Sequence, residues 1–393
     1  MERKRVSELA RQIRGVSYKP EDLHKNLDKN SVILLRANNI FEGKINFDDI
    51  VFVDKSKVSK DQYLRKDDIL ICASSGSKQL VGKASRVDFD GIKCTFGAFC
   101  KVVRPNQDIA QYLNIYFQST NYRRKISEVA IGANINNIRN EHIDALELPV
   151  GIDSENAEVV ATVTVLQQII DRRKQQLQKL DELVKARFVE MFGMPGTDVF
   201  GWGLVPLGSA CNINPKKIHD SRLVSSTEVS FVPMSAVTER GEIDATATKE
   251  YDEVKTGFTY FAENDVLFAK ITPCMENGKG AVAKGLRNGI GFGSTEFHVL
   301  RPIVGKTDPY WIYTLTAFSQ FRMDASNNMT GSAGQRRVPA SFLENYRVSL
   351  PPIALQEQFA AFVEQTDKSK AAIQKALDEA QLLFDSLMQK YFG

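Results

Sequence analysis

Three short segments have residue types found in catalytic or nucleotide-binding motifs, and each departs from its motif where the chemistry needs it. DPYW (Asp308 to Trp311) approaches the Asn/Asp-Pro-Pro-aromatic signature of enzymes that methylate exocyclic amino groups, but it lacks the second proline. GSKQLVGKA (Gly76 to Ala84) has five residues between its glycines and ends on alanine, whereas a phosphate-binding loop has four and then Lys-Ser or Lys-Thr. EVK (Glu253 to Lys255) has the carboxylate and lysine of a metal-dependent nuclease, a combination that any charged turn supplies. The sequence therefore predicts no catalytic centre.

The cysteines and histidines do not predict a metal site. No two of the five cysteines have the CxxC spacing, and the chain has only four histidines. We expect free, buried thiols at Cys72, Cys94, Cys100, Cys211 and Cys274.

No apolar stretch approaches the length of about 20 residues that a membrane-spanning helix needs. The basic N-terminal segment MERKRVSELARQIRG has no apolar run behind it, so it does not have the pattern of a secretion signal. We expect a cytoplasmic protein with no membrane contact.

Positive charge is concentrated in the first 150 residues. The formal net charge of the chain is +3, yet residues 1–150 carry 25 basic and 19 acidic side chains, whereas residues 196–352 carry 16 of each. A basic surface on the first of two globular regions permits an anionic partner without requiring one.

The second half of the chain repeats the first half with an offset of about 197 residues. KDDILICA (Lys66 to Ala73) aligns with ENDVLFAK (Glu263 to Lys270), and VVRP (Val102 to Pro105) aligns with VLRP (Val299 to Pro302). An aromatic helical pattern, a glycine-rich loop and a strand that ends in proline follow in both copies. The copies close on ARFVEMFG (Ala186 to Gly193) and LMQKYFG (Leu387 to Gly393). So many matching blocks in one order predict a duplicated unit.

Each copy combines short runs rich in Val, Ile, Phe and Thr with a long helical pattern. At 393 residues the chain is too long for one ordinary core. We predict an α+β protein with two similar mixed domains, residues 1–150 and 196–352. Two long helices, within residues 151–195 and 353–393, follow the domains.

Both helical segments carry an apolar seam. The predicted seam residues are Val163, Leu166, Ile170, Leu177, Leu180 and Val184 in the first helix and Phe362, Ile373, Leu377, Phe384 and Leu387 in the second. A helix of about 38 residues is about 57 Å long, which exceeds what a domain of this size needs for its own core. We therefore predict that the helices pair as an antiparallel coiled coil about a pseudo-twofold axis. Packing on the helix's own domain, or on another protein, is the alternative.

With these features the sequence resembles the DNA-specificity subunits of Type I restriction-modification systems over essentially its whole length. The segment LPPIALQEQFAAFVEQTDKSKAAIQKALDEAQLLFDSLMQKYFG (350–393) resembles the distal helical region of that family. DILICASSGSKQLVGKA (68–84) resembles a strand-loop-strand inside its recognition domains. The first helical region reads LPVGIDSENAEVV and lacks the proline pair and the Gln356-Glu357 dipeptide of the second. This departure concerns the docking of partner subunits by the two helices and not the predicted architecture.

The resemblance implies a non-catalytic subunit that supplies DNA specificity. Each target-recognition domain would read one half of a split site in double-stranded DNA, and the helix pair would set the gap between the halves. Two methyltransferase subunits would dock around the helices, joined in some assemblies by restriction subunits that translocate and cut DNA. This chain would bind no cofactor, since S-adenosylmethionine would be bound by the methyltransferase subunits. The recognition domains are the variable parts of the family, so the target bases are not implied.

Base readout needs side chains with donors and acceptors on loops that can enter a groove, such as Arg or Lys for guanine and Asn or Gln for adenine. The glycine-rich loops of the two copies supply the candidates, which are Ser75, Lys78, Gln79, Asn134, Asn137 and Arg139 in the first domain and Lys270, Asn277, Lys279, Ser332, Gln335, Arg336 and Arg337 in the second. The alternative for each is an ordinary turn residue. The cluster YRRK (Tyr122 to Lys125) could bind phosphate or form a solvated helix face.

A coiled-coil scaffold that joins proteins through its two globular arms is the rival function. The zero net charge of residues 196–352 favours this alternative. Salt-dependent binding of duplex DNA would separate the two functions, because neutralising phosphates makes affinity fall steeply with salt.

Overall fold

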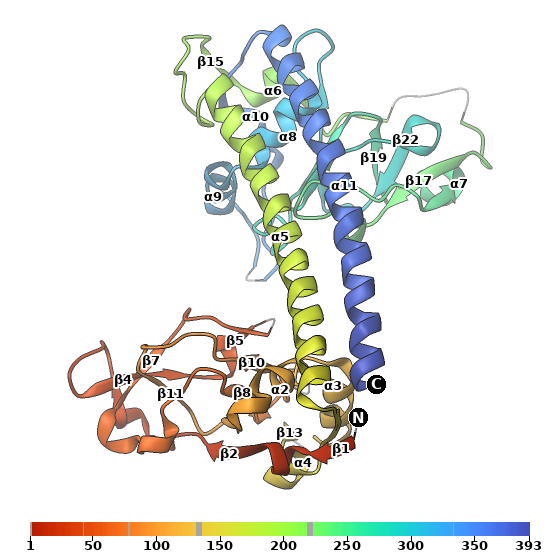
Figure 1. Cartoon of the computed structure of the whole chain (residues 1–393). Helices are drawn as coiled ribbons and strands as arrows, with labels where there is room; N and C mark the ends of the chain where they lie inside the picture. The colour runs from red at the N-terminus through yellow and green to blue at the C-terminus, as the bar shows by residue number, and fades with distance from the viewer. Residues whose placement is uncertain (1, 42, 78, 131–135, 218–222, 333) are drawn as a thin grey trace. The chain divides into compact units, whose positions relative to one another are not determined.

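A computed structural model describes residues 2–41, 43–77, 79–130, 136–217, 223–332 and 334–393 (Figure 1). The chain forms two compact units, Met1–Arg173 with Ala376–Gly393 (unit 1) and Lys174–Lys375 (unit 2). Each unit contains one domain and about half of each of two long helices, α5 (Asp153–Phe192) and α11 (Ile353–Phe392). In the described part of the chain, no helix is both long and apolar enough to span a membrane. The division into four segments at 150, 195 and 352 stays a prediction.

The domain of unit 1 has two four-stranded sheets. Its strands are β1 (Glu2–Arg5), β2 (Ala10–Arg14), β3 (Leu23–His24), β4 (Ser31–Leu35), β5 (Ile40–Phe41), β6 (Lys44–Ile45), β7 (Val51–Asp54), β8 (Ile69–Cys72), β9 (Ser74–Ser75), β10 (Ala84–Arg86), β11 (Cys94–Phe96), β12 (Cys100–Pro105), β13 (Asn136–Asn137) and β14 (Glu147–Val150). Its short helices are α1 (Val6–Leu9), α2 (Ala110–Tyr116), α3 (Thr120–Val129) and α4 (Asn140–Asp144). The sheets have the orders β10-β8-β12-β2 and β11-β4-β7-β3.

The domain of unit 2 is built in the same way. Its strands are β15 (Leu204–Pro206), β16 (Cys211–Ile213), β17 (Glu228–Val232), β18 (Thr248–Glu250), β19 (Thr259–Ala262), β20 (Val266–Ala269), β21 (Gly280–Val282), β22 (Ile290–Gly293), β23 (Phe297–Pro302) and β24 (Arg347–Ser349). Its short helices are α6 (Leu207–Ala210), α7 (Tyr251–Val254), α8 (Pro309–Ala317), α9 (Ser319–Asn327) and α10 (Ala340–Asn345). The sheets have the orders β16-β23-β20-β21 and β18-β17-β22-β19.

The strand orders confirm the duplicated unit. The first sheet of each domain has the same order, with β2, β12, β8 and β10 replaced by β16, β23, β20 and β21. In the second sheet the parallel pair β4–β11 corresponds to the parallel pair β17–β22, and β7 corresponds to β18. Among the described residues the fourth strand differs, because β3 joins β7 in one domain and β19 joins β22 in the other.

A buried ion pair recurs at the same place in both domains. Arg104 donates from Nε and Nη2 to the Asp68 carboxylate, both at 2.7 Å. Arg301 donates in the same two-pronged way to Asp265 at 2.7 and 2.6 Å. Both carboxylates are only 1% exposed. In each domain the ion pair therefore joins the two repeated sequence blocks, KDDIL to VVRP in the first domain and ENDVL to VLRP in the second.

The two long helices pack antiparallel within each unit, as the sequence predicts. In unit 1, Val159 and Val163 near the start of α5 share a core with Met388 and Phe392 at the end of α11. In unit 2 the direction is the same, since the Phe188 ring near the end of α5 lies 5.5 Å from the Phe359 ring near the start of α11. Lys370 of α11 also pairs with Asp181 of α5 at 2.7 Å.

The predicted seam is accurate in α5 and only partly accurate in α11. Val163, Leu166, Ile170, Leu177 and Val184 are buried, and Leu180 is half-buried. Of the residues predicted for the seam of α11, Leu377 is buried, whereas Phe362, Ile373, Phe384 and Leu387 are half-buried. The buried positions of α11 instead repeat those of α5 with an offset of 200, which gives Gln356, Phe359, Val363, Thr366, Leu377, Met388 and Phe392. Two of these residues are polar, so an apolar pattern does not find them.

A buried amide fixes the start of each long helix. Asn156 accepts a hydrogen bond from the backbone N–H of Gly151 and donates one to its carbonyl oxygen, both at 2.9 Å. Gln356 donates to the carbonyl of Pro351 at 2.8 Å and accepts from the N–H of Asp308 at 2.9 Å. The first long helix therefore has a matching buried amide, although Asn156 lies further from the preceding proline than Gln356 does. The bond to Asp308 also ties the start of α11 to the residue that caps α8.

Replacing Arg104 or Arg301 by Met should lower the free energy of unfolding by about 3–5 kcal/mol, because either change leaves a carboxylate buried without its cation. Urea unfolding of the purified chain measures this loss. The control Arg124→Met breaks an exposed pair with Glu128, with side chains 65% and 61% exposed, and should cost less than about 1 kcal/mol. Equal losses in all three variants would contradict a special role for the buried pair.

Candidate nucleic-acid interface

The two candidate loops of the first domain lie side by side. Strands β9 and β13 pair antiparallel, with Asn137 opposite Ser74. The Ser74 hydroxyl donates to Asn137 Oδ1 at 2.8 Å, and the N–H of Ile138 donates to the carbonyl of Ala73 at 2.8 Å. Two segments about 60 residues apart in sequence, residues 73–75 and 136–138, thus form one edge of the domain.

The second domain brings its own candidate loops together with the same backbone bonds. The N–H of Val338 donates to the carbonyl of Lys270 at 2.9 Å, which matches the bond from Ile138 to Ala73. The N–H of Thr272 donates to the carbonyl of Arg336 at 3.0 Å. The two copies therefore present the same edge on different residues.

A third segment completes this edge in both domains, and sequence reasoning missed it. The carbonyl of Phe99 accepts from the N–H groups of Ala73 and Ser74 at 2.8 and 3.0 Å. The carbonyl of Glu296 accepts from the N–H of Lys270 at 2.9 Å. Phe99 is 69% exposed, so most of its ring is accessible to a partner. The available signal was the repeat itself, since both residues stand just before the VVRP and VLRP blocks.

The candidate residues that the structure describes all lie on or beside this edge or its adjoining loop. Gln79, Asn137, Arg139, Asn277, Ser332 and Gln335 are exposed, and Ser75, Lys270, Lys279, Arg336 and Arg337 are half-buried. Lys78 and Asn134 lie outside the described residues. Whether any of these side chains contacts a base stays a prediction.

Arg337 is held in a fixed orientation. Its Nε and Nη2 donate to the Glu296 carboxylate at 2.9 and 2.8 Å, and its Nη1 donates to the carbonyl of Gln335 at 3.1 Å. Hydrogen bonds from Arg337 hold the pKa of Glu296 below its ordinary value, although partial burial opposes this shift. The carboxylate therefore stays charged at neutral pH and keeps the guanidinium in place.

In each domain an arginine on a neighbouring helix binds the backbone of the loop next to the edge. Arg123 of α3 donates to the carbonyls of Val81 and Gln79 at 2.8 and 3.0 Å. Arg322 of α9 donates to the carbonyl of Met275 at 2.7 Å. Burial lowers the pKa of Arg322 to about 10. Both arginines stiffen the loop that follows the central strand, β8 or β20.

The other members of the YRRK cluster also have partners within the domain. Tyr122 is fully buried in the core of unit 1. Arg124 pairs with Glu128 at 3.3 Å, and Lys125 donates to the carbonyl of Glu147 at 3.1 Å. These contacts favour a structural role for the cluster over phosphate binding.

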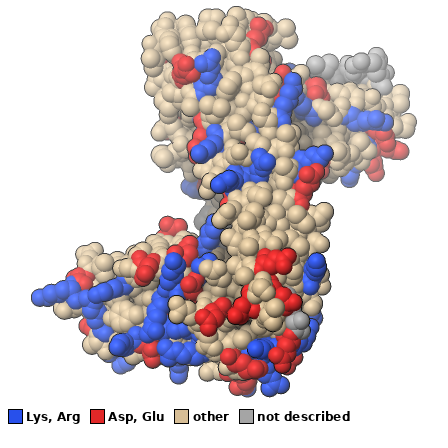
Figure 2. Space-filling model, in the orientation of Figure 1, with Lys and Arg blue, Asp and Glu red and all other residues tan. Residues whose placement is uncertain are grey.

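Basic residues adjoin the edge of the first domain. Lys101 of β12 lies opposite Arg14 of β2, and its ammonium donates to Asn140 Oδ1 at 2.5 Å, next to Arg139. Burial lowers the pKa of Lys101, and the charge of Arg14 adds to this effect. On the face shown in Figure 2, Lys and Arg side chains lie over much of this domain with Asp and Glu among them. In the second domain the position of Lys101 is taken by the buried His298.

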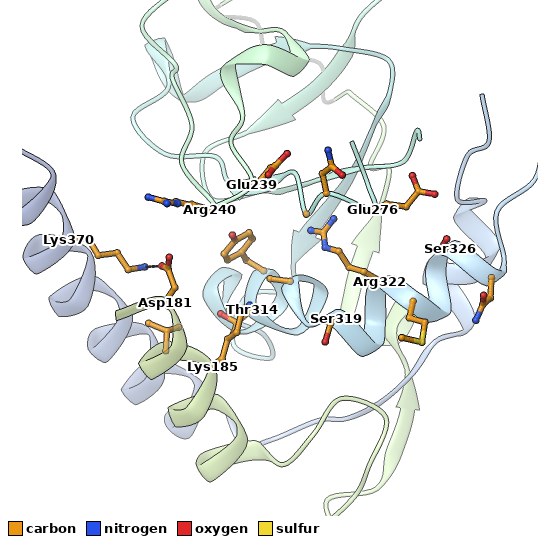
Figure 3. A pocket seen from close by; sticks show the side chains of 17 residues that line it. Asp181, Lys185, Glu239, Arg240, Glu276, Thr314, Ser319, Arg322, Ser326 and Lys370 are labelled. Atoms are coloured by element: carbon orange, nitrogen blue, oxygen red, sulfur yellow. Dashed lines mark ion pairs between the residues drawn. The ribbon is translucent and has the colours of Figure 1, made fainter. Parts of the chain in front are cut away.

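A cavity of about 500 Å³ in unit 2 lies beside the loop that follows β20 (Figure 3). Side chains of both signs line it, among them Asp181 and Lys185 of α5 and Glu239 and Arg240 of a turn. Arg322 reaches from α9 towards the segment that carries Glu276. Such mixed walls do not favour one class of charged ligand.

The segments that approach catalytic motifs have structural roles. Asp308 of DPYW caps α8 by accepting from the N–H of Tyr310 at 2.8 Å, and Trp311 is buried. Lys255 of EVK pairs with Asp252 at 2.6 Å. Within the described residues, no group of three or more His, Cys, Asp or Glu side chains is arranged to hold a metal ion.

The thiols are free, as expected, and four of the five are buried. Cys274 is half-buried. Burial raises the pKa of Cys94 and of Cys211 to about 12, so both stay protonated and unreactive at neutral pH.

Comparison with known proteins identifies the family. A family model of the Type I restriction modification DNA specificity domain matches the chain twice, over residues 2–182 and 201–381. The chain is 28% identical over 400 residues to the Type I restriction enzyme StySPI specificity subunit of Salmonella potsdam, across 98% of this chain and 86% of the relative. It is 38% identical over 195 residues to the EcoEI specificity subunit of Escherichia coli, which covers 48% of this chain and 32% of that relative.

Solved structures share the fold. The S subunit of a Type I restriction-modification system from M. genitalium aligns with a TM-score of 0.55 and 13% identity, over 100% of this chain and 96% of that one. A chain solved in work on complex assembly and conformational transition of the type I R-M system aligns with a TM-score of 0.52 and 16% identity, over 100% and 97%. The predicted architecture of two mixed domains and two long helices is confirmed.

Replacing Arg123 by Met should loosen the loop behind β8, because two charge-assisted hydrogen bonds to its backbone are lost. We expect amide hydrogen exchange at Leu80, Gly82 and Lys83 to accelerate by about 30-fold, which corresponds to about 2 kcal/mol. The control Arg124→Met removes a neighbouring cation that does not touch the loop and should leave these amides unchanged. Unchanged exchange in Arg123→Met would show that the loop is held by other contacts.

Proposed function

This chain belongs to the family of Type I restriction-modification DNA specificity proteins, and we propose that it selects the DNA sequence on which such a system acts. Each domain reads one half of a split site in double-stranded DNA, and the antiparallel helices set the distance between the halves. The observation that carries this proposal is the repeated edge, which combines a constant backbone with different side chains.

A pair of sequence readers needs this combination. The bonds from Ile138 to Ala73 and from Val338 to Lys270 hold both edges in the same shape. At matching positions the side chains differ, since Asn137 stands where Arg337 stands in the second copy. A scaffold that only joins proteins has no need for amide and guanidinium groups at matching positions of two similar frames. The family relationship supports the specificity role over that alternative.

The chemistry belongs to partner proteins in this proposal. Two methyltransferase subunits dock around the helices and bind S-adenosylmethionine, while this chain binds no cofactor and catalyses no reaction. Apolar side chains on the outer faces of the helices support such docking, because Val165 and Ile169 of α5 are 56% and 41% exposed and Leu383 of α11 is 52% exposed. Restriction subunits can join the same assembly, and a role on DNA places the chain in the cytoplasm.

The test is methylome sequencing of a host that produces this chain with and without its neighbouring methyltransferase subunit. We expect a split methylation motif only when both proteins are present. No new motif, with both proteins soluble and associated, would contradict the proposal and favour the protein scaffold.

Inserting one heptad into each helix, after Gln175 in α5 and after Lys375 in α11, should lengthen the gap between the half-sites. The matched insertions keep the seam in register and add about 10.5 Å to each helix. The methylome of the inserted variant should contain both half-site motifs unchanged with a longer spacer. Altered half-site bases with an unaltered spacer would show that the helices do not set the distance.

A further inference from the structure

We infer that one matching position in each domain reads one base pair of its half-site: Asn137 with Phe99 reads an A·T pair, and Arg337 with Glu296 reads a G·C pair. This inference rests on the proposed function and adds the base that each edge selects. It follows from the geometry of three adjacent backbone segments and from the hydrogen-bonding pattern of the base edges.

The two positions are structurally equivalent. Asn137 and Arg337 each precede the residue whose N–H donates to the end of the central strand, at Ala73 and Lys270. Phe99 and Glu296 each accept a backbone bond from that same strand end. In the second domain the side chains at these two positions meet at 2.8 Å. Because the backbone bonds match, we expect the Phe99 ring and the Asn137 amide to face the same side in the first domain.

The second domain has the chemistry for a G·C pair. A guanidinium has five N–H donors, and residues within the described chain use three of those of Arg337. Guanine presents two acceptors in the major groove, O6 and N7, and Arg satisfies both from one plane. Glu296 fixes that plane, and a carboxylate beside it can accept from the amino group of the paired cytosine.

The first domain has the chemistry for an A·T pair. An Asn amide matches the donor and acceptor of adenine, N6–H and N7. Ser74 holds the amide of Asn137 by donating to its Oδ1 at 2.8 Å, and that oxygen has a second lone pair for adenine. The Phe99 ring is 69% exposed and stands at the position of Glu296, where it would provide the apolar contact that the thymine methyl group prefers. The exposed Phe99 ring at the position of the Glu296 carboxylate therefore fits an A·T pair in place of a G·C pair.

The experiment uses the chain together with its methyltransferase subunits. Arg337→Asn should relax or change one G·C pair in one half-site and leave the other half-site as it is. Asn137→Arg should do the same to one A·T pair in the opposite half-site. In each case we expect discrimination at that single position to fall about 10- to 100-fold in methylome sequencing and in competition binding with duplexes that carry each base pair in turn.

Two further variants separate base reading from folding. Arg287→Asn removes an arginine of the same domain that is not a candidate contact residue, whose 3.0 Å pair is with Glu228, and should leave both motifs unchanged. Glu296→Gln keeps the hydrogen-bonding shape without the charge and should weaken the guanine preference less than Arg337→Asn does.

Unchanged motifs in methylating Arg337→Asn and Asn137→Arg complexes would overturn the inference. So would an equal loss of binding for every duplex, because that pattern marks a structural or phosphate-binding residue. The proposed function itself is judged by the wild-type complex, which must give a split motif. A split motif in the wild-type complex, with the same motif in both variants, would overturn only the base assignment and leave the proposed function standing.

Discussion

The buried Asp–Arg pair at one end of each central ladder fixes the register on which the rest of each domain depends. In unit 1, Ile69 lies opposite Val103 and Cys72 lies opposite Cys100. Asp68 and Arg104 stand one step beyond the first of these pairs, and Ala73 and Phe99 stand one step beyond the second. A slip of one residue would turn every side chain to the other face and separate the two charges. The ion pair at one end thus places the candidate reading edge at the other end.

A charged pair sets register more strictly than an apolar contact of the same size. Desolvating a carboxylate and a guanidinium is costly, and the cost is offset only when both prongs of the guanidinium reach the carboxylate. Any other register leaves both charges buried and unpaired, whereas a Val or Ile side chain can pack at a neighbouring register position. Unit 2 repeats the same geometry between Asp265 and Arg301, at the end of the ladder in which Val266 lies opposite Leu300. The domains therefore keep one frame although most of their residues differ.

The sequence was sufficient for the features that repeat and insufficient for those created by tertiary contact. The duplication, both long helices and the seam of α5 follow from offsets and periodicity. The seam of α11 was only partly found, because Gln356 and Thr366 are polar yet buried, Gln356 being bonded to the segment before α8 and Thr366 to its own helix. The candidate loops were found by their turn residues, whereas Phe99 and Glu296 were missed because neither residue type marks a turn or a base contact. Their place beside Ala73 and Lys270 exists only once the ladder has formed.

This arrangement separates the residues that hold the edge from those that face outward. The ion pair fixes the ladder, and Arg123 or Arg322 binds the following loop through backbone carbonyls, so neither contact depends on the side chains exposed at the edge. Asn137 and Arg337 can therefore differ without a change in the frame, and so can Phe99 and Glu296. The neighbouring groups then adjust locally, with a hydroxyl orienting the amide in one domain and a carboxylate orienting the guanidinium in the other. With the base assignment proposed above, a frame of this kind would let DNA-reading domains change their target bases by single substitutions while the buried interactions that determine stability stay the same.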